Sequence, residues 1–244
     1  MNKPQDTQSE PKVYSQAKAF LLSELLPDVS ATFGTTIRSI DDVIKSGDVV
    51  LDTNVLLLPY GAGAESLKHI VEIYKALKKD GRLFVPAQVA REFIKNRPLK
   101  IAELYTGIKQ KLSKFLAPDK LSYPILEGIA EFRALNDAVE KVIALRAEVI
   151  KANTALLKKV RSWEWNDPVS QAYKEHLVGD VIVEPKYEKG TFLEELQKRY
   201  ELAIPPGYKD ASKEDHGIGD LMIWKTILAI GEKNKKDLIF VSGD

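Results

Sequence analysis

The chain has 244 residues, of which 44% are hydrophobic and 29% are charged, and its formal net charge is +1. This length and composition favour a globular protein with one large domain or two small ones. There is no cysteine, which excludes disulfides and thiolate metal sites. The polar start MNKPQDTQSEPK has no hydrophobic signal region, and no apolar run of about 18 residues follows it. We therefore expect a cytoplasmic protein without a membrane segment.

The charges are unevenly distributed along the chain. From Lys95 to Arg161 there are 14 Lys and Arg against 7 Asp and Glu, so this segment carries +7 and the remainder is near −6. A basic segment beside an acidic remainder suits a protein that holds a polyanion near a carboxylate site. A solvated helical surface that is simply rich in lysine is the alternative, and it stays open.

Strands and helices are predicted to alternate in the first part of the chain. Residues 13–46 read as helical, with breaks at Pro27 and Gly34. The stretch DVVLDTN at 48–54 predicts a buried strand, and residues 64–81 predict an amphipathic helix that ends at Gly81. RLFVP at 82–86 is a second strand and AQVAREFIKN at 87–96 a second helix. This alternation predicts a parallel sheet covered by helices.

Residues 99–162 interrupt this alternation with two long amphipathic helices joined by a proline-containing turn. Their apolar stripes comprise Ile101, Leu104, Tyr105, Ile108, Leu112 and Phe115, then Ile129, Phe132, Val139, Val142, Val149, Leu156 and Val160. We expect a helical hairpin inserted into the α/β core. Trp163 and Trp165 follow it, and both packing at a helix end and stacking on bases are open for them.

The last part of the chain returns to the α/β pattern. It contains a short helix after residue 167, an extended VIVEP, a helix opened by a capping box from Thr191 to Glu194, and an apolar helix opened by the GD at 219–220. DLIFVSGD at 237–244 is a further buried strand that ends on a carboxylate. The expected domains are a helical lead-in (1–46), an α/β core (47–98 and 163–244) and the inserted hairpin (99–162).

Four acidic residues are placed to converge. Asp52 and Asp244 follow strands, Glu92 lies in the first turns of a helix after a strand, and Asp220 lies at a helix start. Ligands of open α/β sheets bind at the carboxyl edge. Clustered carboxylates repel one another unless a cation lies between them, and Mg²⁺ or Mn²⁺ are the natural choices for oxygen ligands. Such an ion would activate a water and neutralise a phosphate during in-line attack.

The ordered stretches VVLDTNVLL, LFVPAQVAREF, GIGDLMIW and DLIFVSGD resemble the PIN-domain nuclease superfamily. The stretch IPPGYKD with GDLMIWKTIL and LIFVSGD resembles more narrowly a PIN-like branch found in bacterial proteins. The resemblance covers residues 47–97 and 191–244 and says little about the hairpin. It implies an α/β fold in which a PIN-like parallel sheet is flanked by helices, and the hairpin that the apolar stripes predict would be an insertion into that fold. It also implies that Asp52, Glu92, Asp220 and Asp244 are metal ligands or their water-mediated supports.

The resemblance further implies supporting residues. Thr53 and Asn54 follow the first aspartate, where a hydroxyl or amide would orient a ligand, and ordinary turn chemistry explains them equally well. Lys209, Asp210 and Lys213 match the GYKD and lysine pattern, in which cations would hold the scissile phosphate or are simply solvated. The chain stops at Asp244, whereas members of this branch continue, so we expect a truncated C-terminus, either a fragment or a protein without that part.

The expected function is that of a metal-dependent endonuclease, a hydrolase that cuts nucleic acid, with RNA favoured and DNA open. A catalytically degenerate PIN-like module that binds nucleic acid or a protein without cleaving is the alternative. A phosphatase that acts on small substrates is a third, against which the basic segment argues. A regulatory protein partner and a homo-oligomer both stay open.

Overall fold

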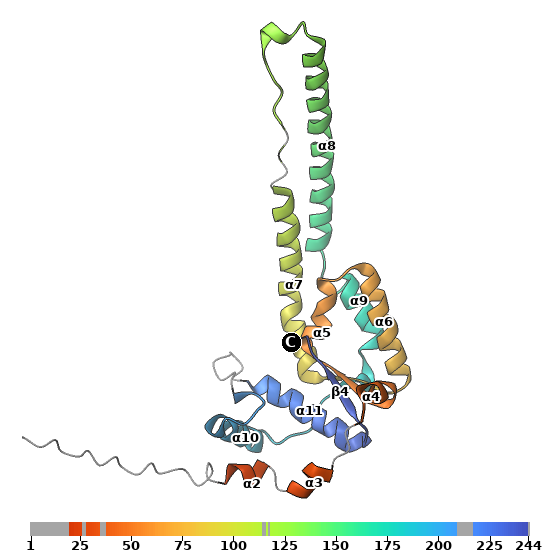
Figure 1. Ribbon diagram of the computed structural model, residues 1–244, viewed down its shortest axis with the longest axis vertical. Coiled ribbons are helices and arrows are strands. Elements are labelled where there is room, and N and C mark those ends of the chain that lie inside the picture. Colours follow the sequence, from red (N-terminus) through yellow and green to blue (C-terminus); the bar gives the residue numbers. More distant parts are fainter. Residues whose placement is uncertain are drawn as a thin grey trace, which may run out of the picture. The chain divides into compact units, whose positions relative to one another are not determined.

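The computed structural model describes residues 20–25, 28–34, 38–113, 116, 118–208 and 217–243 (Figure 1). The chain divides into two compact units. The sheet unit comprises Asp48–Glu184 with Leu238–Asp244, and the helical unit comprises Met1–Gly47 with Pro185–Asp237. The domain ranges expected from the sequence stay a prediction.

The sheet unit is built on four parallel strands. They are β1 (Asp48–Leu51), β2 (Leu83–Pro86), β3 (Ile182–Val183) and β4 (Leu238–Val241), in the order β3-β2-β1-β4. Val50 of β1 lies opposite Phe84 of β2 and Phe240 of β4. All four residues of β1 are buried, as expected for a central strand of a parallel sheet. The predicted α/β class, with a parallel sheet flanked by helices, is confirmed.

Helical crossovers join these strands, as parallel pairing requires. Between β1 and β2 lie α5 (Thr53–Leu57), the 3₁₀ turn η1 (Leu58–Tyr60) and α6 (Ala64–Lys79). Between β2 and β3 lie α7 (Ala87–Ser113), η2 (Pro124–Leu126), α8 (Ala130–Arg161), α9 (Pro168–His176) and η3 (Gly179–Val181). Helix α6 ends as predicted, because Gly81 has a φ of +67°, which glycine adopts without strain.

The predicted hairpin is present, and α7 and α8 pack side by side (Figure 1). Its first helix does not start near residue 99, however. Helix α7 runs without interruption from Ala87 to Ser113 and contains Pro98. A proline inside a helix removes one backbone hydrogen bond and crowds the carbonyl four residues before it, at a cost of about 3 kcal/mol. The side chains of Phe93 and Arg97 are buried on the preceding turns and anchor the helix there, so the separate helix at 87–96 was a wrong prediction.

The helical unit contains α2 (Leu21–Leu25), α3 (Val29–Gly34), α4 (Ile40–Ser46), α10 (Lys189–Leu202) and α11 (Ile218–Asn234). Its core is formed by Phe192, Leu196 and Leu221. The predicted break at Gly34 is confirmed by the end of α3, and Pro27 lies outside the described residues. Among the helices that the structure describes, none combines the length and hydrophobicity needed to cross a membrane.

The start of α10 differs from the prediction. The helix begins at Lys189, and the carboxylate of Glu188 accepts hydrogen bonds from the amides of Gly190 (2.8 Å) and Thr191 (2.6 Å). The predicted Thr191 to Glu194 capping box is therefore wrong, because the Thr191 hydroxyl donates to Glu188 instead (2.8 Å). The hydrogen bonds from Thr191 and Gly190 hold the pKa of Glu188 below its ordinary value.

Candidate active site

Asp52 lies at the carboxyl edge of the sheet, where it caps the N-terminus of α5. Its Oδ1 accepts a hydrogen bond of 2.7 Å from the Thr53 amide, and its Oδ2 accepts one of 2.8 Å from the Ser242 hydroxyl. The Asp52 amide donates to the carbonyl of Val241 at 3.0 Å, a hydrogen bond of the pair that Leu51 forms with Val241 where β1 and β4 end. These contacts fix a half-buried carboxylate at the position that the sequence predicted.

Glu92 lies in the second turn of α7, and its carboxylate is held from two sides. Oε2 accepts a hydrogen bond of 2.6 Å from the Thr53 hydroxyl, and Oε1 accepts one of 3.0 Å from the side-chain amide of Gln88. Thr53 is only 6% exposed, so these bonds are shielded from water. Its amide holds Asp52 and its hydroxyl holds Glu92. One threonine thus brings together two carboxylates from distant parts of the sequence.

The structure brings together part of the predicted set of site residues. Asn54 is exposed on α5. A Cβ atom built on Gly243 would lie 3.3 Å from the Cβ of Asn54, so the segment that follows β4 lies close to Asn54. Asp220 lies in the first turn of α11, as predicted, and α11 belongs to the helical unit. Asp244 and the loop residues Lys209, Asp210 and Lys213 lie outside the described residues.

Ser242 was missed by the sequence analysis. It follows β4 directly, in the VSGD stretch that was selected only for its aspartate. Since β1 and β4 are parallel neighbours, residues that follow both strands meet at the same edge. The edge argument that placed Asp52 and Asp244 therefore also applied to Ser242.

The chemistry of the Asp52 and Glu92 pair fits a hard divalent cation. Carboxylate oxygens are the ligands that Mg²⁺ and Mn²⁺ prefer. Hydrogen bonds of the kind that Thr53, Gln88 and Ser242 donate orient such ligands and leave further lone pairs for a cation. In the described part of the chain no three His, Asp or Glu side chains are grouped to hold a metal ion. The pair therefore fits part of a metal site that needs a further ligand.

A cavity of about 370 Å³ lies beside α5. Asn54 and Tyr60 line it from one side, and Lys100 and Glu103 of α7 line it from the other. The ammonium group of Lys100 lies 2.9 Å from the carboxylate of Glu103, and the Lys100 side chain is 40% exposed. The cavity thus extends from Asn54, two residues after Asp52, to the Lys100 and Glu103 ion pair of α7.

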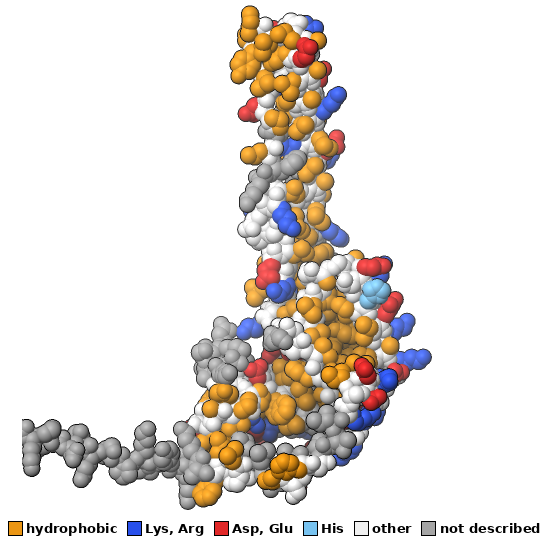
Figure 2. All heavy atoms as spheres, in the orientation of Figure 1, with side chains coloured by type: hydrophobic (Ala, Val, Ile, Leu, Met, Phe, Trp, Pro, Cys, Tyr) orange, Lys and Arg blue, Asp and Glu red, His pale blue; other side chains and the backbone are white. Residues whose placement is uncertain are grey.

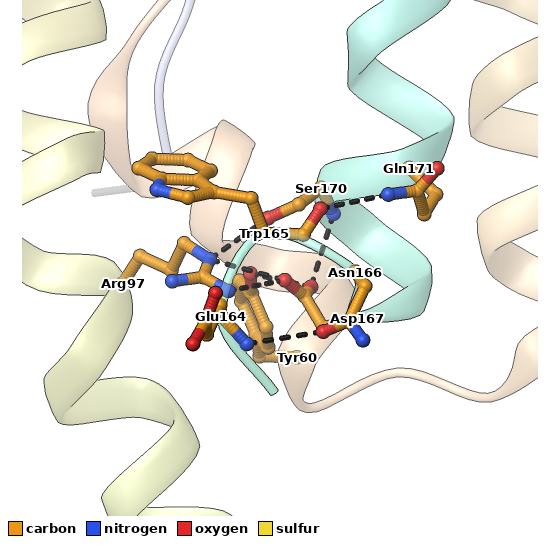
Figure 3. Close-up of polar contacts among 8 residues, drawn as sticks. All are labelled: Tyr60, Arg97, Glu164, Trp165, Asn166, Asp167, Ser170 and Gln171. Atoms are coloured by element: carbon orange, nitrogen blue, oxygen red, sulfur yellow. Dashed lines mark hydrogen bonds and ion pairs between the residues drawn. The ribbon is translucent and has the colours of Figure 1, made fainter. Parts of the chain in front are cut away.

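A second polar cluster, which the sequence analysis missed, joins η1, α7 and α9 (Figure 3). Arg97 donates from Nη2 to Oδ2 of Asp167 at 2.6 Å and from Nε to the Ser170 hydroxyl at 2.8 Å. The Tyr60 hydroxyl donates to Oδ1 of Asp167 at 2.8 Å. Asp167 is fully buried and the Arg97 side chain is 6% exposed. The cluster is thus a buried ion pair between Arg97 and Asp167, to which Ser170 and Tyr60 add further hydrogen bonds.

The titration of this cluster agrees with its geometry. Burial raises the pKa of Tyr60 to about 12, so the phenol stays protonated and donates to Asp167. Burial also opposes the ionisation of Asp167, but the hydrogen bonds from Ser170 and Tyr60 and the charge of Arg97 outweigh it and hold its pKa below the ordinary value. One signal was available in the sequence, because Asp167 followed by Pro168 is typical of a helix start.

Trp165 is placed by this cluster. The guanidinium of Arg97 lies 4.5 Å from the centre of its ring, a cation–π contact. The indole is nevertheless 53% exposed. Packing, one of the two roles considered for Trp165, accounts for the ring face that contacts Arg97. Base stacking by the exposed part of the indole stays a prediction.

Comparison with known proteins places the chain in a family. The profile of the family described as a PIN like domain matches residues 48–244. This match begins at the first residue of β1 and includes Asp52, Glu92, Asp220 and Asp244. A search of curated proteins and a search of solved structures each find no match. Because the matched region covers most of the chain, the protein belongs to the PIN-like domain family, within the nuclease-type PIN superfamily.

Proposed function

We propose that this protein is a metal-dependent endonuclease of the cytoplasm that hydrolyses phosphodiester bonds in nucleic acid, with RNA as the favoured substrate. The proposal depends chiefly on one observation: Asp52 and Glu92 are held together by Thr53 at the carboxyl edge of a parallel sheet. Two adjacent carboxylates are stable as ions when a cation is shared between them. Membership of a nuclease-type superfamily supports the same reaction class.

The proposed ligands for Mg²⁺ or Mn²⁺ are Asp52 and Glu92, completed by Asp220 and Asp244. A bound cation supplies a polarised water and neutralises charge on the scissile phosphate. The chain's own contribution is orientation. Thr53, Gln88 and Ser242 hold the oxygens of Asp52 and Glu92 in place by the hydrogen bonds described above.

Substrate binding is assigned to residues on both sides of this pair. The basic segment 95–161 supplies counter-charge for a phosphate backbone, and Lys100 of this segment lines the cavity that begins at Asn54. Asn54, Lys209, Asp210 and Lys213 are proposed to support the bound strand. An extended basic surface is of use to a polymer and not to a small phosphate ester.

A cleavage assay tests the proposal. Labelled single-stranded RNA and DNA are incubated with the full chain in Mg²⁺, in Mn²⁺ and in EDTA. We expect metal-dependent cleavage, with RNA cut faster, and a loss of about 100-fold or more in Asp52→Asn and Glu92→Gln. Asp80→Asn is the matched control, since Asp80 is an exposed residue at the end of α6.

The outcomes separate the two functions. Cleavage that persists in EDTA, or full activity in Asp52→Asn, contradicts the metal site. Binding of RNA without any cleavage in either metal supports the alternative, a catalytically degenerate module that binds nucleic acid. Circular dichroism of each variant shows whether a loss of activity comes from a loss of fold.

A further inference from the structure

Helix α8 carries two apolar stripes, which the sequence analysis had read as one. The first stripe contains Val139 and Val160, which are 7% and 1% exposed and pack inside the hairpin. The second stripe consists of Leu135, Ala138, Val142, Leu145, Val149, Ala152 and Leu156. Its members recur at alternate spacings of three and four residues, so they form one line along the helix.

The second stripe is largely open to solvent: Val149 is half-buried, and the other members are exposed. Leu135 is 48% exposed, Val142 42%, Leu145 58% and Leu156 49%. Figure 2 shows hydrophobic side chains along much of the hairpin. Single exposed apolar residues are normal, but a continuous apolar line at heptad spacing is typical of a helix that packs against another helix.

In the connection between α7 and α8, the described residues Lys120 and Leu121 make their polar contacts with α8 away from this stripe. Lys120 pairs with Glu140, and the Leu121 amide donates to Asn136 at 3.1 Å. Asn136 and Glu140 occur on the side of α8 away from the second stripe, according to the helical repeat. The second stripe is therefore accessible to another molecule.

We propose that this stripe packs antiparallel against the same stripe of a second copy of the chain, about a two-fold axis near residues 143 and 144. In this register Leu135 lies opposite the partner's Ala152, Ala138 opposite the partner's Val149, and Val142 opposite the partner's Leu145. Each of these pairs combines a larger side chain with a smaller one, as close packing of two helices requires. The interface is isologous, because the two-fold axis makes each helix contribute the same stripe.

Charge complementarity identifies the occupant as a second copy and sets the direction. Lys141 and Glu148 flank the stripe on one side, and both are exposed. In the antiparallel register Lys141 lies beside the partner's Glu148, and the two-fold axis makes this ion pair twice. A parallel, in-register pair would instead bring Lys141 close to the partner's Arg146, where like charges repel. The stripe and its flanking charges are thus complementary to themselves in one orientation.

Sedimentation equilibrium of the full chain tests the interface. We expect a mass that rises with concentration from 27.3 kDa to twice that value. Leu145→Asp should weaken association about tenfold or more, because it places a charge in the centre of the interface. Ala144→Asp is the matched control, since its side chain is also exposed but lies off the stripe and should leave association unchanged.

Charge reversal tests the register. Lys141→Glu and Glu148→Lys should each weaken association, and the double variant should restore it, because the pair is re-formed with the signs exchanged. In a parallel pair Lys141→Glu would strengthen association by attracting the partner's Arg146. A chain that stays at 27.3 kDa at every concentration, a dimer that survives Leu145→Asp, or a double variant as weak as the single ones overturns the proposal.

Discussion

The Thr53 hydroxyl donates a hydrogen bond of 2.6 Å to Glu92, a residue 39 positions further along the chain. The amide of the same threonine donates one of 2.7 Å to Asp52. The relative position of the two carboxylates therefore depends on a buried, uncharged side chain that is not itself a preferred ligand for a divalent cation. Any function of the pair should be sensitive to this hydroxyl.

Replacing Thr53 by valine tests that dependence. Thr53→Val keeps the amide bond to Asp52 and the side-chain volume but removes the donor to Glu92. Cleavage and Mn²⁺ affinity should each fall about 10- to 100-fold, as for other residues that orient metal ligands. The free energy of unfolding should fall by about 1 kcal/mol. Thr53→Ser restores the hydroxyl and should recover most of both losses. Wild-type Mn²⁺ affinity in Thr53→Val, measured by calorimetry, would contradict this role.

The buried ion pair of Arg97 and Asp167 should be important for stability. Arg97→Met leaves the Asp167 charge buried without its cation and should lower the free energy of unfolding by about 3 to 5 kcal/mol. Urea unfolding followed by circular dichroism measures this loss. Arg91→Ala is the control, because Arg91 pairs with Glu184 at the surface and should contribute about 0 to 1 kcal/mol. Equal losses in the two variants would show that burial of the pair is not what matters.

Asp167 should also produce a measurable acid dependence. Its pKa in the folded chain lies below the ordinary value of 3.8, so its contribution to stability is fully present above that value. The contribution is lost as the pH falls from there through the folded pKa. We expect Asp167→Asn to be less stable than wild type at neutral pH and to lose less further stability on acidification below about pH 4. If the free energies of unfolding of the two proteins changed with pH in the same way, a lowered pKa of Asp167 would be excluded.

The exposed lysines of the hairpin should act on nucleic-acid binding in a sequence-independent way. Changing Lys109, Lys111 and Lys158 together to glutamine should weaken binding similarly for all sequences. The slope of log K against log salt should become shallower, by about 0.7 for each lost phosphate contact on a single strand. The matched control makes the same charge change on α6, at Lys68, Lys75 and Lys79. An unchanged slope in the hairpin variant would show that these lysines do not contact phosphates and are simply solvated.

The order of the elements could be predicted because the relevant signals are local. The apolar run at 49–51, the helical spacing of 64–79 and the apolar stretch at 238–241 are each recognisable within a few residues. The position of Asp52 after a strand and of Glu92 and Asp220 near helix starts followed from the same patterns. These placements are confirmed, while the roles of the residues as ligands stay proposals.

Other features depended on contacts between distant segments. The Ser242 contact with Asp52 joins positions separated by 190 residues, and the Arg97 pair with Asp167 joins positions separated by 70. No local period encodes such a pairing. The same is true of helix α7, which runs on from Ala87 to Ser113 although the sequence predicted one helix at 87–96 and another from residue 99. The buried side chains of Phe93 and Arg97 hold the continuous helix in place.

The two stripes of α8 show most simply which features follow from the sequence and which follow from the folded chain. Residue type and the helical repeat are sufficient to predict that Val139, Val142, Leu156 and Val160 lie on one broad apolar side of a helix. Which of these side chains are covered is seen in the folded chain alone: Val139 and Val160 are buried, and Val142 and Leu156 are exposed. The difference arises because burial depends on what the rest of the chain places against a surface, and hydrophobic side chains left uncovered are free to bind something else.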